Sequence, residues 1–533
     1  MKSALARLRA TEPSLFACAA IAVGIALAMF LLQGHVGINL QDEAFLWYGA
    51  IRTHAGELPL RDFRSYDPGR YFWCASGMTM LGDGLVAVRA ANWAFAALGL
   101  CAGLLIASRS HRSIPWLVTC GLVLVPWIHP PWKLYESSVA MLVAFIAVRL
   151  MESPSSARRF AAGAVVGLAA FFGRNMGVYA GLAMLVLVSV QVWKQRQPVL
   201  RSLGDLALGT LVGYAPMIGL VLLADGFREA FVESIAFYTR QSALNAERAF
   251  PFPWRIDFSR RDAWSAAVAF VIGSLFLALP IAYAAGFLRG MSARASTFAR
   301  WSTVFALSCV GGVWFHHASV RSDTPHLAQS IHPFLLLVLS LPAALPERVR
   351  LRGRIAALLF LTGVTVLGIG NALPVVRRAL ATDVVPYERL VLRGDELVLA
   401  PNDARLVRSL MAGITTNVLP EEALWVSAHF LGLYPILDRR APTWDIYPAW
   451  QADDVEQERM LRELRDVRWA VLDTRPIGGD ARMRLENSHP RVWRWVMESF
   501  ERQPLPGVPD SVLLLRRKDA SAEQRPSGDR QER

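Results

Sequence analysis

Two adjacent carboxylates, Asp42 and Glu43, stand at the head of a polar segment that follows the first apolar block of the sequence. Apolar residues recur after them at helical spacing, which predicts a helix lying on a membrane surface. Carboxylates in a first helical turn are stabilised as anions by the unsatisfied N–H groups and the helix dipole. An ionised carboxylate can take a proton from a hydroxyl group. The alternative is that Asp42 only caps the helix and that Glu43 is a solvated surface charge.

Four cations lie beside apolar blocks, where they could bind a phosphate group: Arg70, Lys133, Arg174 and Arg321. Arginine binds phosphate through two parallel hydrogen bonds. Arg174 has only a tight Gly-Arg-Asn turn between two apolar blocks, so we expect it to be paired with an acid or bound to phosphate. The alternative for each of the four is an anchor at the membrane interface.

A second cluster combines Arg321, Asp323 and His326 within six residues, so that a cation, an anion and an imidazole come together. Three more histidines, His316, His317 and His332, lie nearby. Histidine with carboxylate suits zinc or manganese. No HxxxH or HxxE spacing supports a metal site, so loop histidines are the favoured interpretation and a divalent cation is left open.

The elements that must position these residues are membrane-spanning helices. Of the 533 residues, 54% are hydrophobic and 19% charged, which excludes a disordered or fibrous chain. The apolar residues form blocks of roughly 15–25 residues, the length that spans hydrocarbon. We predict a polytopic α-helical membrane protein with about eleven spans: 14–33, 84–107, 114–128, 137–150, 160–173, 176–193, 203–224, 263–287, 301–315, 331–345 and 355–376.

The basic residues orient these spans, because Lys and Arg are held in cytoplasmic loops. Alternate loops are rich in arginine, which places them and the N-terminus in the cytoplasm and explains much of the net charge of +13 without nucleic acid. The opposite segments, which include the outer loop 34–83, then face outward. We predict a transmembrane domain over 1–376, a periplasmic α/β domain over 377–518 with strands near 423–427, 469–472 and 511–515, and a disordered tail over 519–533.

The outer loop resembles the first periplasmic loop of GT-C glycosyltransferases, in particular the bacterial protein mannosyltransferase-like and aminoarabinose-transferase-like branch. The features that carry the resemblance are the Asp-Glu pair after the first span, an amphipathic helix ending near Gly56, the Leu-Pro-Leu-Arg-Asp-Phe run at 58–63, and the Asp67-Pro68 turn. The sequence departs where Gly69 replaces a second proline of the family and where a preceding lysine is missing. Arg70 is the candidate to replace that lysine.

This resemblance implies an enzyme of the bacterial inner membrane that moves a sugar from a polyprenyl-phosphate carrier to a lipid, glycan or protein acceptor outside the cytoplasm. By the same resemblance Asp42 is the catalytic base or orients the acceptor, supported by Glu43. Asp67 and the four cations are substrate-binding candidates, and Asp323 and His326 complete the pocket. The segment 321–326 is similar to a late-loop motif of the same proteins. Some members use a divalent cation and others do not.

Two other classes of protein are weighed against this one. A transporter or lipid flippase also needs many helices, but its ionisable residues are expected at the middle of the membrane rather than in outer loops. An O-antigen polymerase or ligase has its large outer loop between late helices, not after the first. No GxGxxG or GxxxxGK[ST] motif occurs in a strand-to-helix context, which argues against a cytosolic nucleotide-sugar donor.

Overall fold

The structure is a computed structural model that describes residues 15–241, 248–370 and 387–518. Contacts divide the chain into two compact units. The first, here called the helical unit, comprises Met1–Val36, Tyr66–Glu229 and Glu247–Val384. The second, here called the α/β unit, comprises Gly37–Ser65, Ala230–Ala246 and Val385–Arg533. The predicted boundary at 376 and the predicted disordered tail at 519–533 lie outside the described residues.

Among the described residues, seven helices are long and apolar enough to cross a membrane, or up to nine if each of two bent helix pairs is one span. The seven are α2 (Leu15–Gln33), α5 (Leu85–Ala107), α7 (Leu134–Glu152), α9 (Arg174–Gln195), α13 (Ala263–Ser292), α14 (Ala295–Val320) and α17 (Glu347–Ile369). The bent pairs are α10 (Val199–Gly213) with α11 (Ala215–Leu223), and α15 (Thr324–Ser330) with α16 (His332–Ala344). Shorter helices are α4 (Gly69–Leu81), α6 (Ile114–Leu124), α8 (Ser156–Phe172) and α12 (Phe227–Gln241).

The described helices confirm a polytopic helical protein, but the count of about eleven spans falls to seven to nine of membrane-spanning length, because α6 and α8, in the predicted spans 114–128 and 160–173, are too short. The predicted span 203–224 is broken into two helices, and the predicted span 331–345 is the second helix of a bent pair. The pair α10 and α11 bends by 57°, and the pair α15 and α16 bends by 50°. A proline stands in the first turn of the second helix of each pair, at Pro216 and Pro333. Because proline lacks an N–H and clashes with the preceding turn, it ends the first helix and starts a new direction.

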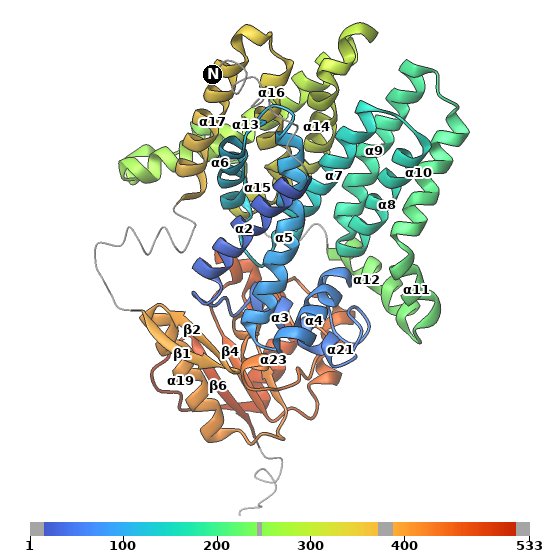
Figure 1. Ribbon diagram of the computed structural model, residues 1–533. Helices are drawn as coiled ribbons and strands as arrows, with labels where there is room; N and C mark the ends of the chain where they lie inside the picture. Colours follow the sequence, from blue (N-terminus) through green and yellow to red (C-terminus); the bar gives the residue numbers. More distant parts are fainter. Residues whose placement is uncertain (1–14, 242–247, 371–386, 519–533) are drawn as a thin grey trace, which may run out of the picture. The chain divides into compact units, whose positions relative to one another are not determined.

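Helices α8 and α10 approach each other closely in the helical unit (Figure 1). A Cβ atom on Gly163 would lie 2.0 Å from the carbonyl oxygen of Leu206, and one on Gly209 would lie 2.0 Å from that of Phe160. Glycine is therefore required at both positions. Small residues at this spacing let two backbones pack directly, as in other membrane helix pairs.

The α/β unit holds two small sheets. Strands β1 (Glu388–Leu392) and β2 (Asp395–Leu399) form an antiparallel hairpin. The second sheet has the order β3-β4-β6-β5, with β3 (Leu424–Val426) parallel to β4 (Trp469–Asp473), and with β6 (Val512–Arg517) antiparallel to both β4 and β5 (Phe500–Gln503). The strands predicted near 423, 469 and 511 are thus confirmed.

The helices of this unit are α19 (Pro401–Asn417), α20 (Leu433–Ile436), α21 (Asp454–Glu463), α22 (Leu485–Ser488) and α23 (Pro490–Ser499). Helices α21, α22 and α23 share an apolar core with the larger sheet, and Trp425, Met460 and Val496 are among its residues. The same unit contains α3 (Asp42–His54), so residues 37–65 of the outer loop group with the C-terminal residues.

Candidate functional site

The acidic pair begins helix α3, as the sequence predicts, and the structure gives its two members different surroundings. The Asn39 side chain caps the helix, since its Oδ1 accepts hydrogen bonds from the N–H groups of Gln41 at 3.0 Å and of Glu43 at 3.4 Å. Glu43 is only 3% exposed, and its Oε2 accepts from the Asn39 N–H at 3.2 Å. The Tyr447 hydroxyl donates to Asp42 Oδ1 at 3.2 Å. Glu43 is therefore not a solvated surface charge, and the side-chain cap belongs to Asn39.

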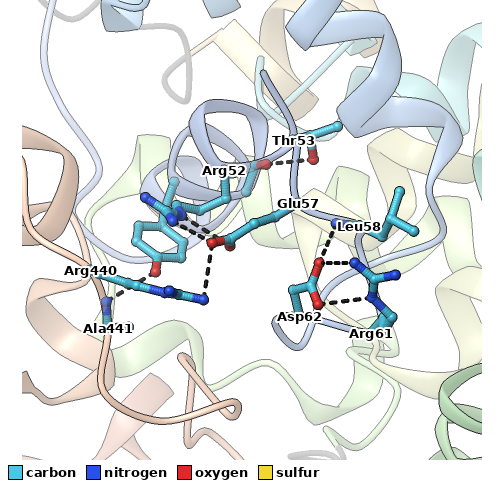
Figure 2. Close-up of polar contacts among 10 residues, drawn as sticks. Arg52, Thr53, Glu57, Leu58, Arg61, Asp62, Arg440 and Ala441 are labelled. Carbon is cyan, nitrogen blue, oxygen red and sulfur yellow. Dashed lines mark hydrogen bonds and ion pairs between the residues drawn. The ribbon is translucent and has the colours of Figure 1, made fainter. Parts of the chain in front are cut away.

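The chain that follows α3 is fixed by ion pairs, shown in Figure 2. The carboxylate of Glu57 binds both Arg52 and, at 3.0 Å, Arg440 from the C-terminal residues. Asp62 pairs with Arg61 and accepts the N–H of Leu58 at 2.7 Å. The loop carrying the acidic pair is thus held to the C-terminal part of its own unit.

In the helical unit, Asp67 and Arg174 form one ion pair although 107 residues separate them. One oxygen of Asp67 accepts the backbone N–H of Arg174 at 2.7 Å, and the other accepts its Nε at 2.9 Å. Asp67 therefore caps the start of α9 and neutralises the first side chain of that helix. Of the two predicted states of Arg174, the structure has the one paired with an acid.

Arg70 is buried, with 3% of its surface exposed, and is engaged by protein groups. Its Nη2 donates to Glu136 Oε1 at 3.1 Å and its Nε donates to the carbonyl of Phe172 at 3.0 Å. The guanidinium also lies over the rings of Tyr66 and Tyr135, at 4.6 and 5.2 Å from their centroids. Sequence reasoning missed Glu136, although a carboxylate in the first turn of an apolar block was a usable signal.

A chain of charged and titratable groups continues from Glu136. His317 and Lys133 both interact electrostatically with its carboxylate. The ring of His317 lies 5.4 Å from that of His326, and its Nε2 is 3.0 Å from Gln329 Oε1. The helical unit thus brings Arg70, Lys133 and His326, which the sequence predicted separately, into one connected network.

Asp323 is the centre of the predicted Arg-x-Asp-x-x-His cluster. Its Oδ2 accepts from Arg321 Nε at 2.8 Å, and its Oδ1 lies 2.6 Å from His326 Nδ1. Burial alone would raise the pKa of this carboxyl, but the hydrogen bonds and charges of His326 and Arg321 outweigh burial and lower the pKa to about 2. In the described ranges, no three His, Cys, Asp or Glu side chains are placed to share a metal ion.

A cavity of about 480 Å³ adjoins Asp323 and contains cations that the sequence analysis did not select. Arg248, Arg255 and Arg261 line it, and the side chains of Val268 and Ile272 on α13 give it an apolar wall. The signal available in the sequence was the concentration of arginine and aromatic residues at 248–261, in a loop predicted to face outward. We refer to this space as the arginine cavity.

Comparisons with known proteins give matches only among solved structures. No family model and no curated protein matches the sequence. ArnT from Cupriavidus metallidurans bound to undecaprenyl phosphate is 14% identical, with a TM-score of 0.49 over 93% of this chain and 97% of that chain. The same protein in the apo state gives 14% identity and a TM-score of 0.47 over the same shares. Likeness at this level does not by itself assign an activity to the chain.

Proposed function

We propose that this protein is a membrane glycosyltransferase of GT-C type. It transfers a sugar from a polyprenyl-phosphate carrier to a lipid, glycan or protein acceptor on the periplasmic side of a bacterial inner membrane. The observation that carries the proposal is the arginine cavity, because three arginines beside an apolar helix face suit a ligand with an anionic head and a hydrocarbon tail. The motif resemblance of the outer loop supports the same class of enzyme.

The reaction needs a proton acceptor and a phosphate-binding group, and we assign the first role to Asp42 and the second to the arginines of the cavity. The acceptor hydroxyl oxygen forms a bond to the anomeric carbon, and its proton passes to the Asp42 carboxylate. The bond between the anomeric carbon and the carrier phosphate oxygen breaks, and the electron pair leaves with the phosphate. Cations that bind this phosphate stabilise the charge that it gains.

The proposal divides the predicted cations by their surroundings. Arg255 and Arg261 line the cavity with exposed side chains and are assigned to the carrier phosphate. Arg70 and Arg174 are held by Glu136 and Asp67, so they are assigned to the framework that shapes the pocket. Lys133, Arg321, Asp323 and His326 complete the electrostatic surroundings of the site.

The location of the site is part of the proposal. We infer from the arginine-rich loops that the N-terminus is cytoplasmic and that the outward segments, which include the outer loop, residues 248–261 and the C-terminal region, face the periplasm. A sugar donor carried by a lipid phosphate is available on that side, whereas nucleotide sugars are cytosolic. This orientation agrees with the absence of nucleotide-binding motifs from the sequence.

The test is sugar transfer by the purified full-length protein from a synthetic polyprenyl-phosphate sugar. Replacing two of the three cavity arginines, R255Q with R261Q, should raise the donor KM at least about 10-fold, because each charge-assisted hydrogen bond is worth about 1.5–3 kcal/mol. The matched control is R228Q, since the side chain of Arg228 is 73% exposed and pairs with its sequence neighbour Glu229. The R228Q variant should leave the donor KM unchanged.

The base assignment is tested in the same assay. D42N should lower kcat by roughly 10²-fold or more without changing the donor KM, because the amide cannot take the proton. Full activity of D42N would remove Asp42 from the reaction. Movement of the labelled carrier across proteoliposomes without any transfer would instead favour a flippase.

A further inference from the structure

The carboxylate of Asp42 is bonded to a residue that comes about 400 positions later in the chain. Tyr447 donates its hydroxyl hydrogen to Asp42 Oδ1 at 3.2 Å. Its ring also packs against Phe45, one turn further along α3, with 5.4 Å between the ring centroids. The phenol therefore meets the carboxylate in a fixed direction, with the aromatic ring lying along the helix start. Both residues belong to the α/β unit.

Tyr447 is itself held by a buried ion pair. Its backbone N–H donates to Asp445 Oδ1 at 3.1 Å. Arg64 Nη1 donates to both oxygens of Asp445, at 2.7 and 2.8 Å, and to the Tyr447 carbonyl at 3.0 Å. Only 4% of Arg64 is exposed. A buried arginine whose Nη1 is shared among three acceptors holds a backbone segment in one conformation more firmly than an exposed ion pair does.

The same arginine contacts two aromatic rings. Its guanidinium carbon lies 4.5 Å from the ring centroid of Phe237 on α12 and 5.3 Å from that of Trp450. Arg64 thus fixes three segments at once: the end of the outer loop, the C-terminal part of α12, and residues 445–450. The Tyr447 hydroxyl projects from the last of these onto Asp42.

We propose that Tyr447 is a positioning residue for the Asp42 carboxylate and that residues 445–450 of the C-terminal region are thereby part of the reaction machinery. This inference rests on the proposed function, in which Asp42 takes the acceptor proton. A base works only when its oxygen is held in line with the hydroxyl that it deprotonates, and a misplacement of about 1 Å can cost about 10²-fold in rate. The phenol restricts the carboxylate to one rotamer before the substrate arrives.

The test replaces Tyr447 by phenylalanine in the full-length protein, which keeps the ring against Phe45 and removes only the hydroxyl. We expect kcat to fall about 10-fold while the donor KM stays within about two-fold of wild type, because the carrier phosphate is bound by other groups. The matched control is Y48F. Tyr48 lies on the same helix, and its hydroxyl accepts the Ala441 N–H at 3.0 Å. The Y48F variant should keep wild-type kcat.

A second variant acts through the support of Tyr447. R64K replaces the planar guanidinium, which hydrogen-bonds Asp445 while lying over two aromatic rings, by an ammonium group that cannot do both in the same geometry. It should lower kcat in the same direction, again with little change in donor KM. Wild-type kcat in Y447F, or an equal loss in Y48F, would overturn the positioning role. If D42N is inactive while Y447F is normal, only this inference fails. If D42N is fully active, the proposed base fails as well.

Discussion

The buried pair between Arg70 and Glu136 gives the sharpest test of the framework assignment. The side chains are 3% and 10% exposed, and 3.1 Å separates Arg70 Nη2 from Glu136 Oε1. At an effective dielectric constant of about 20, unit charges at this distance attract by about 5 kcal/mol. Desolvation offsets much of this attraction in the intact pair. Removing only the cation leaves a buried carboxylate without its partner, which costs about 3–5 kcal/mol.

We therefore expect R70M to lower the free energy of unfolding by about 3–5 kcal/mol, and R70M combined with E136Q to recover at least half of that loss. Neutralising both partners removes the uncompensated charge, so the two changes are not additive. The assay is denaturant or thermal unfolding of the detergent-solubilised protein, with donor KM measured in parallel. The framework role would be refuted if R70M had wild-type stability and its donor KM rose 10-fold. That result would return Arg70 to the phosphate site predicted from the sequence.

Two further predictions concern stability. G209A should destabilise the protein, because its methyl group would lie 2.0 Å from the Phe160 carbonyl oxygen. G204A on the same helix is the control and should be neutral, because a methyl group there has nothing within 4 Å. Thermal unfolding measures the stability of both variants. In the folded protein the pKa of Asp323 is about 2, against a usual value of 3.8. The ionised carboxylate therefore adds to the free energy of unfolding above pH 3.8, and this added stability is lost as the pH falls toward 2. The shift corresponds to about 2 kcal/mol. Wild type should lose this stability relative to D323N as the pH falls from about 4 to about 2, and parallel stability curves for the two proteins would contradict the assignment.

The helices and strands were predictable because their signals are local. Apolar blocks of membrane length predicted the spans, and the start of α3 at Asp42 followed from a carboxylate before an apolar stripe. The bends at Pro216 and Pro333 were also visible as prolines, but a hydropathy average does not register them. Local composition therefore predicted the type and place of the elements better than their continuity.

The pairing of charges was not predictable, because it depends on contacts between distant residues. The sequence presented Arg70 as a phosphate cation and left Arg174 either paired with an acid or bound to phosphate, whereas the structure joins them to carboxylates 66 and 107 residues away. The place of Glu136 in the first turn of an apolar block marks it as unusual, but does not name Arg70 as its partner. The arginine cavity forms because residues 248–261 pack beside α13, and no sequence motif predicts this packing. A single sequence shows which charges exist, but not which are already neutralised.

The position of Arg64 between Asp445, Phe237 and Trp450 makes three segments thermodynamically linked. A change that moves Phe237 alters the free energy of the conformation that holds Tyr447 on Asp42. Linkage is reciprocal, so a change that orders Asp42 favours by the same free energy the conformation of α12 that contacts Arg64. Helix α12 and the start of α3 are therefore coupled through one guanidinium group.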